Sequence, residues 1–202
     1  MKVRVRLFAV LAAVCFLTAG AWASPIINVG TIEAQPGTIE TFSISVTGGG
    51  AVQGLDFYIQ IGDGGAANNG SGTKPIITNV DIIGPGTLFN ASNVGQTNAF
   101  TSDLLWAVST TTEASVADFL DASGVIAFVT IDTAGTAAGE SYPLLLSGVA
   151  TGAFGPPGVD TAFAGVPAAI TNGQISIVPE PATLSLLGLA ALGIIARRRR
   201  AA

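Results

Sequence analysis

The sequence predicts an all-β protein whose central part folds as an antiparallel sandwich. Three observations lead to this fold class. Short runs between residues 24 and 178 alternate apolar and polar side chains with a period of two, which is the pattern of half-buried strands. Glycine and proline gather between these runs, where turns need them. No part of this region shows the spacing of an amphipathic helix, apart from a short helical turn expected over Ser115–Leu120.

The alternation is clearest in four runs, which cover residues 38–47, 55–61, 104–108 and 125–131. In the first run, Phe42, Ile44 and Val46 fall on one side and hydroxyl-bearing residues on the other. The second and third runs repeat this pattern. In the fourth run both sides are apolar, which predicts a central strand covered on two faces.

Residues 1–23 have the organisation of a secretory signal peptide. Three basic residues precede an apolar core over Leu7–Leu17, which is too short for an ordinary membrane span. Ala21 and Ala23 then supply the small-x-small pattern that signal peptidase accepts. A buried helix of the fold is the alternative, and the position at the extreme N-terminus argues against it. We therefore expect an N-terminal signal helix that is cut off after Ala23.

The charge and cysteine content of the exported part exclude several kinds of partner and site. Cleavage removes Cys15, the one cysteine, so neither a disulfide nor a thiolate metal site is expected. Residues 24–178 carry twelve acidic residues and one basic residue, Lys74, a net charge near −11. Such a field repels nucleic acid and anionic lipid, and it favours basic partners. Nucleic acid is therefore excluded as a partner.

The sequence contains few of the residue types that enzymes use for catalysis. It contains no histidine, which excludes serine triads, cysteine–histidine pairs and histidine-bound zinc. A pair of carboxylates, as in glycoside hydrolysis, remains, and Asp118 and Asp121 are the candidates. Their spacing is common on exposed turns. We therefore predict no enzymatic activity, no catalytic residues and no cofactor.

The segment 62–72 is rich in glycine and is expected to be a long loop at one end of the sandwich. Asp63, Asn68 and Asn69 in it carry oxygen atoms that could hold a calcium ion. Their spacing matches no defined calcium loop, and turns use the same residue types for backbone reasons. The sequence therefore favours a plain loop and predicts no metal site.

Two aromatic residues are candidate contacts for a sugar ring, because sugar rings stack on exposed aromatic faces. Trp106 shares its alternation with Leu104 and Val108, which predicts a place in the core. Tyr58 falls on the polar side of its run, together with Asp56 and Gln60. Tyr58 is therefore the predicted surface contact.

Several short motifs of the central region occur in the order found in cohesin-like domains. They are Ile27–Gly30, Gln35–Thr38, Val52–Ile61, Ser123–Ile131, Tyr142–Leu146 and Asn172–Ile177. Most of residues 26–178 resembles this family. The resemblance implies a nine-stranded jelly-roll sandwich that binds dockerin modules or, in related modules, polysaccharide. The chain departs from the family pattern after Ile61, where the glycine-rich loop replaces an acid and a proline.

The C-terminal tail has the features of a membrane stop signal. Residues 183–196 are apolar and without charge, and as a helix their 14 residues reach about 21 Å, against about 30 Å of hydrocarbon. This predicts a C-terminal apolar helix that is a marginal span. Four arginines follow it and are expected to stay on the cytoplasmic side, where they stop transfer: Arg197, Arg198, Arg199 and Arg200. A plain tail anchor, the alternative, would show the same apolar segment and the same arginines.

The four residues before the apolar segment add a specific signal. Val178, Pro179, Glu180 and Pro181, followed by the apolar segment and the arginines, resemble the PEP-CTERM sorting signal of Gram-negative bacteria. The resemblance implies recognition by an exosortase, a transpeptidase-like membrane enzyme, with processing near Pro-Glu-Pro and delivery to the cell exterior. Proteins with this signal accompany extracellular polysaccharide production.

These features divide the chain into a signal peptide (1–23), a cohesin-like sandwich (24–177) and a sorting signal (178–202). The predicted function is that of an exported, non-enzymatic protein, held briefly in the inner membrane and then delivered to the cell surface or the exopolysaccharide matrix. The alternative is a cohesin-like binding module for a dockerin-type partner or a polysaccharide. A glycosidase based on two carboxylates is a third hypothesis.

Overall fold

The computed structural model describes residues 24–65, 74–113, 119–148, 159–163 and 166–179. These residues form β-strands joined by turns. Within them, no helix has the length and apolar character needed to cross a membrane. The predicted signal helix and the apolar segment 183–196 lie outside the described residues. The helical turn expected over Ser115–Leu120 is wrong at its last two residues, because Phe119 lies in no helix and Leu120 lies in a strand. Residues 115–118 are not described.

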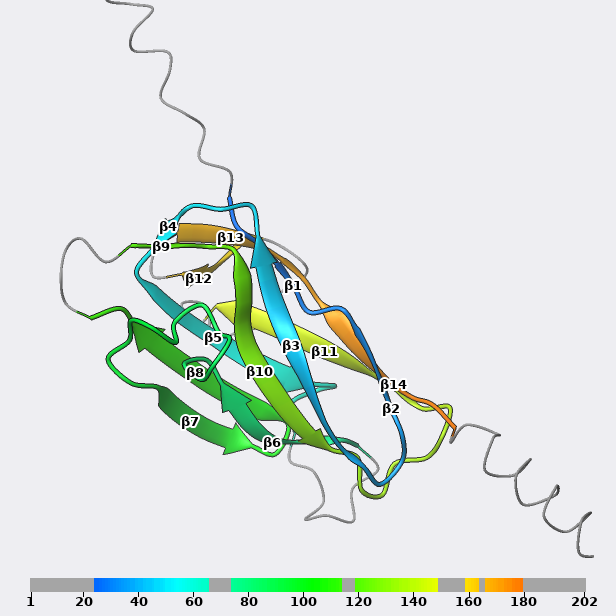
Figure 1. Ribbon diagram of the computed structural model, residues 1–202. Helices are drawn as coiled ribbons and strands as arrows, with labels where there is room; N and C mark the ends of the chain where they lie inside the picture. Colours follow the sequence, from blue (N-terminus) through cyan, green and yellow to red (C-terminus); the bar gives the residue numbers. More distant parts are fainter. Residues whose placement is uncertain (1–23, 66–73, 114–118, 149–158, 164–165, 180–202) are drawn as a thin grey trace, which may run out of the picture.

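Most of the strands build two six-stranded sheets that pack face to face (Figure 1). Sheet A has the order β12-β13-β1-β3-β10-β6, and sheet B has the order β2-β14-β11-β5-β8-β7. A short pair, β4-β9, lies beside them. The strands are β1 (Ile26–Asn28), β2 (Thr31–Ala34), β3 (Ile39–Thr47), β4 (Ala51–Val52), β5 (Gly54–Ile61), β6 (Ile76–Asp81), β7 (Thr97–Ser102), β8 (Leu105–Thr111), β9 (Leu120–Asp121), β10 (Gly124–Asp132), β11 (Ser141–Gly148), β12 (Val159–Phe163), β13 (Val166–Thr171) and β14 (Gly173–Ile177).

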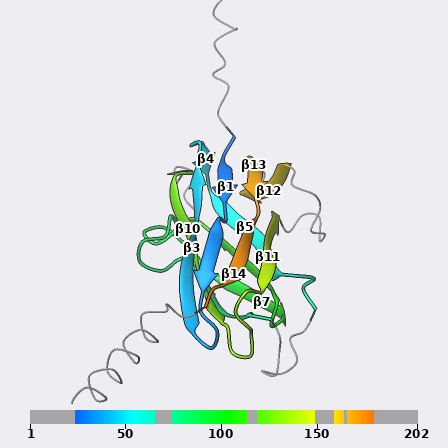
Figure 2. The same ribbon diagram turned by 90° about the vertical axis from the view of Figure 1, so that its right-hand side faces the viewer.

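The core lies between the two sheets and is built by the predicted alternation. In β5 the side chains of Leu55, Phe57, Ile59 and Ile61 are buried, and β3 contributes Ile44 and Val46 in the same way. In the view of Figure 2, β3 and β10 lie on one side of this core, and β5 and β11 lie on the other. The largest fully buried side chains are those of Phe57, Phe89, Ile27, Ile44, Leu55, Ile59, Ile61, Ile82, Leu104, Ile126 and Ile131.

Strand β10 lies inside its sheet, as predicted, but its apolar sequence has a second cause. It pairs with β3 on one side and with β6 on the other. A bulge between Val125 and Ala127 brings two consecutive residues, Ile126 and Ala127, into the core. Phe128 on the opposite side is only half-buried. The run of apolar residues therefore reflects the bulge as well as the central position.

The first two strands run parallel to the last two strands beside them, which corrects the antiparallel prediction. β1 pairs with β13 in parallel, and β2 pairs with β14 in parallel. Both segments pass from sheet A to sheet B at the same place, β1–β2 through Gly30 and β13–β14 through Asn172. Period-two alternation identifies a strand but carries no information on the direction of its neighbour. As a result, the chain enters the sandwich at one end and leaves it at the opposite end (Figure 1).

The side chain of Gln96 closes the open edge of β6. Its Nε2 donates a hydrogen bond to the carbonyl oxygen of Val80 (2.5 Å), and its Oε1 accepts one from the backbone amide of Ile82 (2.8 Å). Gln96 directly precedes β7, the edge strand of sheet B. Its amide therefore links the two sheets and covers backbone groups that an edge strand otherwise leaves unpaired.

The substitution Gln96→Ala is expected to lower the free energy of unfolding by about 1–3 kcal/mol, because it leaves two half-buried backbone groups without partners. Gln174→Ala is the matched control, since Gln174 is exposed on β14, and it is expected to change stability little. Urea unfolding of both variants measures the difference. Equal effects would contradict the assignment of Gln96 as the cover of this edge.

Candidate functional site

The outer face of sheet B carries acidic, hydroxyl and aromatic side chains. Because residues paired across neighbouring strands point to the same face, the ladder partners of Asp56, Tyr58 and Gln60 define this surface. Asp56 pairs with Ser109, which pairs with Thr97. Tyr58 pairs with Ala107 on one side and with Ser147 on the other. We call this surface, centred on Asp56 and Tyr58, the β5–β8 face.

A hollow of about 350 Å³ opens at one end of the β5–β8 face. Its lining includes Asp56, Val94, Gly95, Thr97, Ser109 and Thr111. The loop before β7 forms one wall and is tied to β8 by two hydrogen bonds, from the amide of Val94 to the carbonyl of Thr111 (3.0 Å) and from the hydroxyl of Thr110 to the carbonyl of Gly95 (2.9 Å). The hollow is therefore part of the folded framework. It combines an exposed apolar side chain, Val94, with hydroxyl groups and one acid.

Asp56 lies in the wall of this hollow and has an unusual environment for an acid. Partial burial raises the pKa of its carboxyl group above the usual value. Aspartate is also a poor strand former, so its place in the middle of β5 is not explained by local preference. A partner that brings a cation or a hydrogen-bond donor would relieve the cost of this partly desolvated carboxylate.

Tyr58 lies on the same face, two residues along β5 from Asp56. It is half-buried, and its neighbours across β8 and β7 are the small residues Ala107 and Ala99. Tyr58 therefore lies on the outer face of sheet B, and its role as a surface contact stays a prediction.

Trp106 does not belong to this face. It pairs with Ile59, a buried residue, and it packs against the core with partial exposure. The prediction that Trp106 is a core residue is therefore confirmed. Tyr58, by contrast, is an aromatic residue that the strand pairing places on the β5–β8 face.

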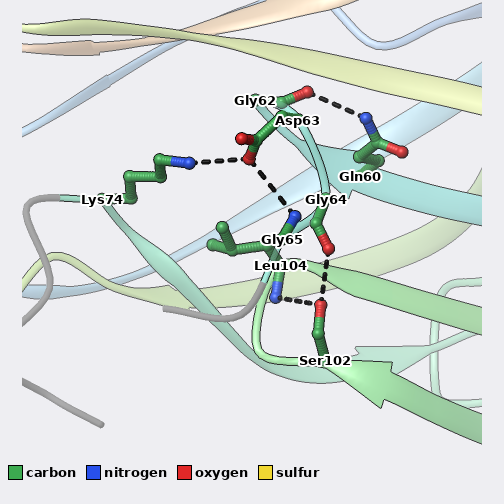
Figure 3. Close-up of polar contacts among 8 residues, drawn as sticks. All are labelled: Gln60, Gly62, Asp63, Gly64, Gly65, Lys74, Ser102 and Leu104. Carbon is green, nitrogen blue, oxygen red and sulfur yellow. Dashed lines mark hydrogen bonds and ion pairs between the residues drawn. The ribbon is translucent and has the colours of Figure 1, made fainter. Parts of the chain in front are cut away.

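An ion pair holds the start of the glycine-rich loop (Figure 3). Asp63 Oδ1 lies 2.6 Å from Nζ of Lys74 and accepts a hydrogen bond from the amide of Gly65 (3.2 Å). The hydrogen bond from Lys74 is the main cause that lowers the pKa of Asp63. Asn68 and Asn69 lie outside the described residues. Within the described part of the chain, no three acidic, histidine or cysteine residues come together as a metal site.

The same loop folds down onto the lower end of the β5–β8 face. Gln60 Nε2 donates to the carbonyl of Gly62 (2.8 Å), and the hydroxyl of Ser102 donates to the carbonyl of Gly64 (2.9 Å) (Figure 3). These contacts explain why Gln60 is buried although it points outward. The loop therefore covers the Gln60 end of the β5–β8 face.

The predicted carboxylate pair is not assembled among the described residues. Asp118 lies outside them, and Asp121 Oδ1 accepts a hydrogen bond from the amide of Gly50 (3.2 Å). Asp121 borders a second hollow of about 270 Å³ near β4 and β9, beside the exposed ring of Phe119. This acid therefore serves as a turn acceptor.

The predicted sorting motif begins at the edge of the folded body. Its first two residues, Val178 and Pro179, are described, and Val178 is half-buried whereas Pro179 is exposed. The remaining predicted sorting and cleavage residues lie outside the described residues: Glu180, Pro181, Arg197, Arg198, Arg199, Arg200, Ala21 and Ala23.

Comparison with known families identifies this tail. Residues 178–200 match the PEP-CTERM protein-sorting motif. The match agrees with the resemblance seen in the sequence and covers the motif, the apolar segment and the arginines. It indicates an exported protein that is sorted to the cell envelope. The comparison with curated proteins gives no match.

Comparison with solved structures shows that the body is similar in fold to cohesins. The sixth cohesin of scaffoldin B from Acetivibrio cellulolyticus, solved with a dockerin, has a TM-score of 0.54 and 19% identity, covering 76% of this chain and 99% of that chain. A type I cohesin–dockerin complex from Clostridium thermocellum gives 0.54 and 15%, covering 77% and 99%. A non-cellulosomal cohesin from the archaeon Archaeoglobus fulgidus gives 0.52 and 16%, covering 77% and 92%. The likeness shows the all-β sandwich fold of cohesins.

Proposed function

We propose that this chain is an exported, non-enzymatic protein of the cell surface or exopolysaccharide matrix, whose body is a binding module. Signal peptidase cuts after Ala23, and an exosortase recognises the motif beginning at Val178 while residues 183–196 hold the chain in the inner membrane of a Gram-negative bacterium. The match of residues 178–200 supports this route. The absence of histidine and the cohesin-like sandwich, proposed as a jelly roll, support a binding role.

The β5–β8 face is the proposed contact surface, and the hollow at Asp56 is the observation that carries this proposal. Its acid is partly desolvated, and the walls supply hydroxyl groups and an exposed valine. This chemistry suits a protein partner that presents a lysine, an arginine or hydroxyl groups next to an apolar side chain. The net charge near −11 of residues 24–178 attracts such a partner. A dockerin-type domain is the partner class that the cohesin-like fold favours, since two of the similar cohesins were solved with dockerins.

A polysaccharide is the second candidate partner, and Tyr58 is the observation that favours it. Its ladder partners place the ring on the outer face of sheet B, in one row with Ala107 and Ala99, and flat sugar faces stack on aromatic rings. The two candidates differ in their dependence on charge. Binding of a basic protein weakens steeply as salt rises, whereas stacking of a neutral sugar on Tyr58 does not.

The test is retention of partners from the producing organism on the immobilised mature protein. A protein retained by the wild type at low salt, lost in Asp56→Asn and kept in Thr47→Ala, supports the protein partner. Thr47 is the control because it is exposed on β3 in the opposite sheet. Retention of neutral polysaccharide that disappears in Tyr58→Ala supports the sugar. Failure to retain either class would reject the binding role.

The variant Asp56→Asn is expected to bind its partner at least tenfold more weakly and yet to be slightly more stable at neutral pH. A raised pKa means that the folded state disfavours the charged acid, so Asp56 contributes stability below its usual pKa and loses it as the pH rises through the folded value. The amide carries no such cost. Thermal unfolding at pH 4 and pH 7 measures this, and a neutral-pH midpoint below that of the wild type would contradict it.

A further inference from the structure

The last strand, β14, is held on both sides up to its final residue. It pairs with β11 and with β2, and Ile175 and Ile177 are buried in the core. The amide of Ile177 donates to the carbonyl of Glu140 (2.9 Å), and the carbonyl of Ile177 accepts from the amide of Gly139 (2.7 Å). The chain is therefore part of the folded body through Ile177.

Val178 continues this ladder although it is also the first residue of the sorting motif. Its amide donates to the carbonyl of Ala34 in β2 (2.8 Å), and its side chain is half-buried. Pro179 then ends the ladder, because proline has no N–H to donate. The ladder thus ends between the first and second residues of the matched region 178–200, and Pro179 is exposed.

No linker separates the body from the membrane segment. Five residue steps lead from Val178 to Thr183, where the apolar segment starts, and a fully extended chain of this length spans at most about 17 Å. An enzyme that binds an extended peptide needs several residues clear of other structure. Val178 lies in the ladder, so Pro179 is the first residue of the motif outside it.

We propose that the docked end of β14 sets the upstream limit of processing: the sorting enzyme acts on a body folded through Val178, and it cuts C-terminal to Pro179. This inference rests on the sorting function proposed above. It adds where the enzyme cuts and which part of the fold limits the cut. In the cut, the acyl group of the body passes to water or to an amine or hydroxyl acceptor, and the tail leaves with a free amino group. The mature chain keeps Val178 in its ladder with β2. The nearby body also hinders access of the enzyme to its substrate.

Three variants of the full chain, expressed in the producing organism, test this constraint. Insertion of Gly-Ser-Gly-Ser between Val178 and Pro179 moves the motif away from the body and is expected to shorten the processing half-time several-fold. Deletion of Val178 moves the motif into the ladder position and is expected to lengthen the half-time several-fold. Val178→Ala, which keeps the spacing and the N–H group, is expected to match the wild type.

Pulse-chase labelling gives the half-times, and intact mass gives the new C-terminus. Thermal unfolding of each mature body verifies that it is folded. A wild-type product that ends at or before Val178, equal half-times in all four chains, or a Val178→Ala chain as slow as the deletion would each overturn the inference. An unprocessed wild-type chain would instead reject the sorting function itself.

Discussion

Gly173→Ala is expected to be among the most destabilising single substitutions in this protein, with a loss of about 3 kcal/mol or more. A β-carbon at Gly173 would lie 2.1 Å from the carbonyl oxygen of Gly30 and 2.8 Å from Cγ1 of Val29. The first contact is with backbone, which cannot rotate away as a side chain can. The amide of Gln174 also donates to this same oxygen (3.1 Å), so a shift of the strand would break a ladder bond.

Gly30→Ala is the matched control at the other side of this contact. Gly30 has a φ of +77° but nothing within 4 Å of its would-be β-carbon, so the substitution is expected to cost only about 1–2 kcal/mol of backbone strain. Urea unfolding of both variants gives the comparison. A smaller loss for Gly173→Ala than for Gly30→Ala would show that the two crossing segments are not in close contact.

Phe57→Ala is the second large effect, with an expected loss of about 3–5 kcal/mol in the free energy of unfolding. Phe57 is fully buried between the sheets and is among the largest core side chains. Truncation leaves a cavity that surrounding strands cannot fill without breaking their ladders. Calorimetric or urea unfolding measures the loss.

The neighbouring substitution Tyr58→Ala is the control, because the side chain of Tyr58 points to the opposite face of β5. It is expected to weaken sugar retention while changing stability much less than Phe57→Ala. A larger loss of stability for Tyr58→Ala would place Tyr58 in the core and contradict the assignment of the β5–β8 face.

The strands could be predicted from the sequence because each has a local signal. Alternation in 55–61 identified both the strand and its buried side, and turn residues marked the joints. The parallel pairing of β1 with β13 and of β2 with β14 could not be predicted, because it joins residues from opposite ends of the chain. The bulge at Val125–Ala127 was also hidden, since an apolar run looks the same with and without it.

The candidate site was predicted only in part. Tyr58 was identified because it interrupts a polar row, but the hollow beside it was missed. Three separate segments build that hollow, at Asp56, at Val94–Thr97 and at Ser109–Thr111. The sequence of any one of them does not predict it. The signal that could have pointed to it is the aspartate in the middle of a strand, where local preference disfavours that residue.

The parallel pairing of β2 with β14 affects the order in which the chain folds during export. β2 lies at the edge of sheet B, and β14 is its neighbour there. A chain that crosses the membrane from its N-terminus delivers β2 early, yet this strand must wait for residues 173–177. Contacts between such distant segments form slowly. On the export route proposed above, the sandwich therefore closes only when residues 183–196 reach the membrane, so completion of the body and arrival of the sorting signal coincide.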